Sequence, residues 1–125
     1  MNISRGFICT GAIYLVIGIV LGSYMGASGD HNLTPVHAHI NLLGFTLMTV
    51  FGLLYRVVPE LTRSPLSLAH FWLFQIGALL LLIALFLLIG GFVAAESIGP
   101  MMPIPELAVL LGVLALVVNL FKTRW

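Results

Sequence analysis

The sequence predicts an all-α integral membrane protein, a bundle of four transmembrane helices with both termini in the cytoplasm. Hydrophobic residues make up 61% of the 125 residues and charged residues only 7%, whereas soluble domains carry about 25% charged residues. Four apolar stretches approach or exceed the roughly 20 residues that span a hydrocarbon core. With four spans, all the basic residues fall on one side of the membrane: Arg5, Arg56, Arg63, Lys122 and Arg124.

The first two predicted helices cover residues 7–27 and 36–58. The first is longer than the roughly 7–15 apolar residues of a signal peptide, so we expect it to be retained. The glycines and other small residues of 26–30 end it. Thr34 is the expected capping residue of the second helix, and Pro35 stands near its first helical position, where no N–H is needed.

The third and fourth predicted helices cover residues 68–91 and 106–121. Pro59 and Pro65 bracket the short turn that precedes the third helix, and three prolines punctuate the longer loop before the fourth. Because the connections are short and contain no linker, we expect one membrane domain that covers residues 1–125.

The distribution of charge predicts the orientation. The side opposite the basic residues carries Asp30, Glu96 and Glu106 but no Lys or Arg. The positive-inside rule then places both termini in the cytoplasm, as in a multi-pass protein of the cell inner membrane. The net charge of +1 gives no reason to expect a nucleic-acid partner, and the lipid bilayer is the expected environment.

A stripe of small residues on the first helix predicts a close helix–helix contact. Gly11, Gly18 and Gly22 follow one another at intervals of seven and four residues, which places them along one side of a helix. In lipid, small residues allow two helix backbones to approach closely.

Two histidines, His37 and His39, open the second apolar stretch. An imidazole within a membrane is costly without a partner and is therefore a candidate functional group. Residues two apart lie about 200° apart around a helix axis, so the two rings face nearly opposite sides and cannot chelate one metal together. The spacing predicts a separate site on each side of the helix, and the alternative is a pair of satisfied polar groups near the membrane interface.

The second and third helices resemble two consecutive helices of a known family. His37 and His39, followed by Gly44, Phe51, Tyr55 and Pro59, are similar to the tenth helix of the catalytic subunit of haem–copper oxidases. The following stretch, from Leu68 through His70-Phe71-Trp72 to Ile76-Gly77, resembles the start of that family's next helix. Together the two matches cover about half the chain.

The resemblance implies that His37 binds one haem iron and His39 another, on opposite sides of the helix. It implies haem b, held without a covalent bond because the chain has no Cys-x-x-Cys-His motif. Phe51 is a candidate to pack on a porphyrin face, and His31, beside Asp30 in the outer loop, is a candidate to bind a haem propionate.

The chain departs from the family in ways that change the expected function. Its only other histidines are His31 and His70, so the three further histidines of the family's copper site are missing. His70 enters from the opposite side of the membrane and is expected to be an interfacial histidine. Without the copper ligands, the reduction of oxygen is not expected, and the chain has one third of the roughly twelve spans of the oxidase subunit.

Two classes of function follow. The first is a b-type haem protein that transfers electrons or senses a diatomic gas. The alternative is a haem-free packing or assembly subunit of a respiratory complex, or a small transporter. For the first class we expect a homotrimer, in which His37 of one protomer faces His39 of the next and three copies recreate the twelve-span layout. A dimer that shares haems at its interface is the main competing arrangement.

Overall fold

The computed structural model describes all residues 1–125 and contains helices but no strand. Four helices are long and apolar enough to cross a membrane, which confirms the predicted spans. The first is α1 (Ile3–Ser28), and the second is continuous from α2 (Thr34–His39) through the π-helix η1 (Ile40–Leu47) to α3 (Met48–Val57). After the 3-10 helix η2 (Pro59–Arg63) come α4 (Pro65–Ile89), the short α5 (Ala95–Ile98) and η3 (Gly99–Met101), and finally α6 (Pro103–Lys122).

Each helix begins earlier than the apolar stretch that predicted it. The observed starts are Ile3, Thr34, Pro65 and Pro103, against predicted starts at residues 7, 36, 68 and 106. For α1 and α4 the difference arises because a helix continues into polar residues where its first N–H groups find acceptors. The side chain of Asn2 accepts from the N–H of Arg5 at 3.0 Å, and α4 is capped in the same way by Ser64.

The expectation that Thr34 caps the second helix is wrong. Thr34 is the first helical residue, and no side chain caps this helix. Its hydroxyl donates to the carbonyl of His31 at 2.7 Å, so the side chain stabilises the preceding turn. Pro35 does lie in the first turn, as predicted, and Gly29 ends α1 in the left-handed conformation with φ 72°.

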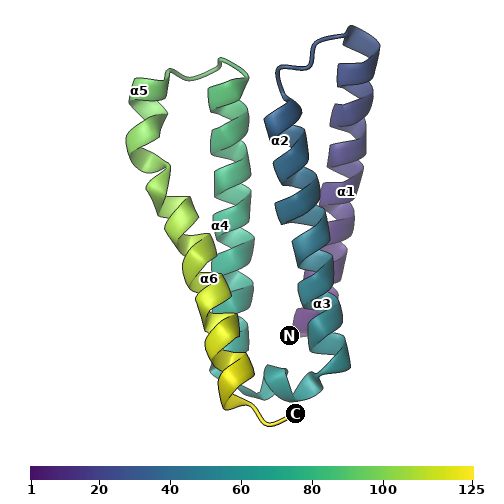
Figure 1. The fold of residues 1–125 in the computed structure, drawn as a ribbon, viewed down its shortest axis with the longest axis vertical. Helices are drawn as coiled ribbons and strands as arrows, with labels where there is room; N and C mark the ends of the chain where they lie inside the picture. The colour runs from purple at the N-terminus through teal and green to yellow at the C-terminus, as the bar shows by residue number, and fades with distance from the viewer.

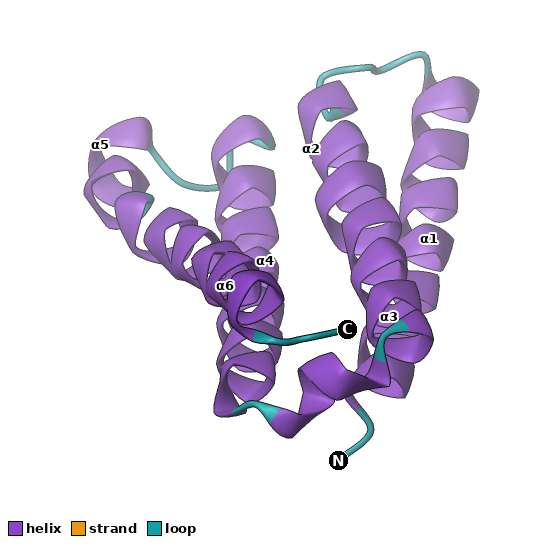
Figure 2. Ribbon diagram, turned by 60° about the horizontal axis from the view of Figure 1, so that its bottom comes forward, coloured by secondary structure: helices purple, strands orange, loops and turns teal.

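The four helices form two hairpins. The second helix packs along α1, and α4 packs along α6 (Figure 1). Contacts between the hairpins are fewer and involve mainly α4 with α1 and with the second helix. In Figure 2 the hairpins diverge away from the end that holds both termini. That same end holds the turn between α3 and α4, so the structure gathers all five basic residues there.

The predicted close contact along α1 is confirmed. A Cβ added to Gly11 would lie 2.9 Å from Oγ1 of Thr49, and one added to Gly18 would overlap the side-chain oxygen of Asn41. The glycines therefore leave spaces that polar side chains of the second helix occupy. In return, Tyr14 of α1 fills the space beside Gly44.

Candidate functional site

The backbone of the second helix changes from α to π immediately after the histidine pair. Residues Ile40–Leu47 form the π-helix η1, and the hydroxyl of Thr46 donates to the carbonyl of Asn41, five residues earlier, at 2.9 Å. π-helical segments are rare and frequently occur at functional sites. The residues on either side of η1 are therefore candidates for a functional site.

His37 lies half-buried on the side of its helix that faces α1. A Cβ added to Gly22 would lie 2.9 Å from Cε1 of His37, so the imidazole fills the space that this glycine leaves. The side-chain amide of Asn41 donates to Nε2 at 3.1 Å, whereas Nδ1 is buried and has no hydrogen-bond partner. A neutral imidazole has one acceptor nitrogen, and in His37 that nitrogen is engaged by Asn41.

His39 is exposed and has the opposite arrangement of hydrogen bonds. Its Nδ1–H donates to the carbonyl of Pro35 at 2.7 Å. Since a carbonyl only accepts, Nδ1 carries the proton and Nε2 keeps its lone pair. Ligating histidines commonly bond one ring nitrogen to a carbonyl in this way, which fixes the ring and raises the basicity of the other nitrogen. Nε2 of His39 is therefore available to accept a hydrogen bond or to bind a metal ion.

The other two predicted site residues, His31 and Phe51, contact groups outside this pair. His31 lies in the loop between α1 and α2, exposed, with Nδ1 bonded to the carbonyl of Gly29 at 3.0 Å. Phe51 is buried twelve residues beyond His39, which corresponds to about 18 Å along a helix. Phe51 contacts His70, with ring centroids 4.6 Å apart, so Phe51 does not lie beside the ring of His37 or His39.

His70 occupies a buried position that the sequence did not indicate. Its side chain is fully buried near the start of α4, and its place at the membrane interface stays a prediction. The hydroxyl of Tyr55 and Nδ1 of His70 share a hydrogen bond of 2.9 Å, which joins α3 to α4 and therefore one hairpin to the other. The rings of Phe7, Phe51 and Phe74 surround the imidazole at centroid distances of 5.0, 4.6 and 5.9 Å.

Within this aromatic enclosure Nε2 of His70 has no hydrogen-bond partner. A buried polar atom without a partner lowers stability, so the enclosure is a candidate for a role beyond packing. The sequence could have given one indication of this position, because His70 is a polar residue six positions into an apolar helix. The sequence does not indicate its hydrogen-bond partner, because Tyr55 lies fifteen residues away and meets His70 only through the packing of the two hairpins.

Replacement of Tyr55 with phenylalanine is expected to lower the free energy of unfolding by about 1–3 kcal/mol, because Nδ1 of His70 then loses its hydrogen-bond partner. Replacement of both Tyr55 and His70 with phenylalanine is expected to restore much of that loss, since no polar atom of the pair remains. Denaturant unfolding in detergent, followed by helical circular dichroism, measures both effects. If the double variant loses the sum of the two single effects, the hydrogen bond does not couple these residues.

The polar side chains do not form a metal site by themselves. No group of three or more His, Cys, Asp or Glu side chains is placed to hold a metal ion. A bound iron would therefore take most of its ligands from a porphyrin, with one or two imidazoles added by the protein. Of the two predicted ligands, His39 fits this role as it stands, whereas His37 would first have to exchange the amide of Asn41 for iron.

Comparison of the chain with models of protein families, with curated proteins and with solved structures finds no match. The resemblance to haem–copper oxidases consequently rests on the residues of the second and third helices alone.

Proposed function

We propose that this chain is a membrane b-type haem protein, related to the haem–copper oxidases but without a copper site, that transfers electrons or binds a diatomic gas. The observation that carries the proposal is the hydrogen bond from Nδ1 of His39 to Pro35, which leaves Nε2 free on the exposed side of the helix. Bound haem would supply an iron that changes oxidation state or binds a gas.

His37 is the proposed second ligand of the iron. Its Nε2 would become available for iron when the hydrogen bond from Asn41 breaks. Its ring faces α1 and that of His39 is exposed, which agrees with the separation of about 200° derived from the spacing. An iron bound by His39 alone has an open position suited to a gas, whereas two histidine ligands favour electron transfer.

The absorption spectrum of the purified protein tests this function. A Soret band is expected, and its shift with carbon monoxide distinguishes an open iron position from one filled by two histidines. Colourless protein from cells supplied with haem precursors would contradict the proposal.

The exposure of His39 supports assembly of several copies, because a porphyrin on this surface would otherwise face lipid. We propose a homotrimer, in which His37 of one protomer and His39 of the next share a haem, with a dimer as the competing form. Native mass spectrometry in detergent is expected to show three chains and three haems. A haem-loaded monomer would contradict shared ligation.

A haem-free role as a packing or assembly subunit, or as a small transporter, is the second candidate. The contact between His37 and Gly22 favours it, because here the histidine serves the packing of one hairpin. Under this hypothesis, replacing His39 changes nothing that the protein binds.

We also propose that the protein lies in the cell inner membrane with both termini in the cytoplasm. Support comes from the five basic residues at one end of the bundle and the positive-inside rule. A reporter that is active only in the cytoplasm, fused after Trp125, is expected to be active. Activity of a periplasmic reporter at the same position would show the opposite orientation and contradict this proposal.

A further inference from the structure

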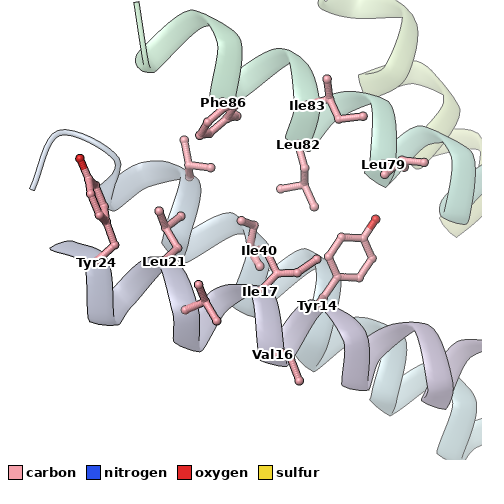
Figure 3. Close-up of a pocket in the computed structure, with 12 residues that line it drawn as sticks. Tyr14, Val16, Ile17, Leu21, Tyr24, Ile40, Leu79, Leu82, Ile83 and Phe86 are labelled. Atoms are coloured by element: carbon pink, nitrogen blue, oxygen red, sulfur yellow. The ribbon is translucent and has the colours of Figure 1, made fainter. Parts of the chain in front are cut away.

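An open apolar cavity of about 640 Å³ lies between the two hairpins where they diverge. Figure 3 shows side chains of α1 and α4 facing one another across it, with Tyr24 and Phe86 towards one end and Tyr14 and Leu79 towards the other. All the residues that line it are hydrophobic. Its volume is in the range of about 300–1,000 Å³ that small-molecule sites occupy.

The length of the cavity along the helices corresponds to the thickness of the hydrocarbon layer of one bilayer leaflet. It follows α1 from Tyr14 to Tyr24, ten residues or about 15 Å of helix, and a hydrocarbon core is about 30 Å thick. The surrounding medium at this depth consists of lipid tails, which are as apolar as the lining. A single hydrocarbon chain of that leaflet therefore matches the cavity in both polarity and length.

A second cavity, lined by both apolar and polar residues, continues the first towards the acidic end of the bundle. Its volume is about 360 Å³, and it shares Leu21, Tyr24 and Phe86 with the apolar cavity while adding Asp30 and Asn32. One carboxylate oxygen of Asp30 accepts from the N–H of Asn32 at 3.0 Å, which leaves the other oxygen for a ligand. No Lys or Arg lies at this end, so a cationic group is favoured over an anionic one.

We infer that the two cavities form one binding site for an amphiphile, a phospholipid of this leaflet with a primary-ammonium headgroup. One acyl chain occupies the apolar cavity, and the ammonium group donates to the carboxylate of Asp30 in a charge-assisted hydrogen bond. The inference does not depend on haem, since neither His37 nor His39 lines either cavity.

The test is native mass spectrometry of protein purified with equal amounts of phosphatidylethanolamine and phosphatidylglycerol. Retention of phosphatidylethanolamine is expected. Ile17→Trp and Leu82→Trp, which fill the cavity, are expected to lose the lipid. Leu80→Trp is the matched control. Leu80 lies on α4, as Leu82 does, but it is 48% exposed and lies outside the cavity. Ile17 is itself 45% exposed, so its replacement is expected to leave the fold intact even if the variant of the buried Leu82 fails to fold.

The headgroup is tested by Asp30→Asn, with Glu96→Gln as the control at the same end. Asp30→Asn is expected to abolish the preference for phosphatidylethanolamine, and Glu96→Gln is expected to retain it. Equal lipid retention by Ile17→Trp and Leu80→Trp would overturn the site. A preference that survives Asp30→Asn would overturn the headgroup assignment. If Ile17→Trp dissociates an oligomer without losing lipid, the cavity receives a second copy of the chain and the inference fails.

Discussion

Replacement of His39 with alanine is expected to abolish the proposed binding of haem. His39 is the only one of the two predicted ligands whose Nε2 is free, because its Nδ1–H is bonded to Pro35. Even the loss of an outer-shell partner costs about 10–100-fold in metal affinity, so the loss of the ligand itself is expected to cost at least that much. The haem-to-protein ratio, determined as the pyridine haemochrome, measures the effect.

Two further variants make this experiment decisive. Leu42→Ala changes an exposed residue on the next turn of the same helix and is expected to keep full haem content. His37→Ala is expected to lower haem content or to change the spectrum, because it removes the second proposed ligand. If His37→Ala and His39→Ala both retain haem with an unchanged spectrum, the ligand assignment is wrong and the haem-free role gains support.

Replacement of Gly77 with leucine is expected to separate α4 from α6 and to destabilise the second hairpin. A Cβ at this position would lie 2.9 Å from the backbone nitrogen of Val109 and 3.1 Å from Cβ of Ala108. A backbone atom cannot rotate away as a side chain can, so the helices must move apart. Overpacking typically costs about 1–3 kcal/mol, and the reciprocal contact of Gly112 with the backbone nitrogen of Phe74 predicts a similar loss for Gly112→Leu.

Gly26→Leu is the matched control, since no atom lies within 4 Å of the position where its Cβ would be. This variant is expected to unfold at the same or a slightly higher denaturant concentration, because glycine within a helix costs about 0.5–1 kcal/mol relative to alanine. Equal denaturant midpoints of unfolding for Gly77→Leu and Gly26→Leu would show that α4 and α6 can move apart without loss of stability.

Much of the fold could be predicted because it depends on local sequence. Four apolar stretches and the prolines between them predicted the spans and turns. The glycine interval of α1 predicted a close helix–helix contact, and the structure shows that the second helix makes it. The contact of Gly77 with Val109 was less accessible, since a lone glycine in an apolar helix carries no periodic signal. How the two hairpins meet depends on side chains far apart in the chain.

The candidate site was predicted in part for the same reason. The helix period placed His37 and His39 on different sides, and the structure gives them different surroundings. The hydrogen bond between Tyr55 and His70 exists only because α3 packs on α4, which no local pattern reveals. The π-helix was missed because most residues of 40–47 are apolar, so the sequence there carries little information on helical phase.

The π-helix η1 makes the length of the chain critical at a place where no loop is present. Each residue added to or removed from a helix rotates everything beyond it by about 100°. A deletion within Ile40–Leu47 would leave His37 beside Gly22 but turn Phe51 and Tyr55 away from His70. A gene encoding this protein therefore has little freedom to gain or lose a codon within η1, whereas the turn at Gly29–Leu33 can change length without altering the alignment of either half.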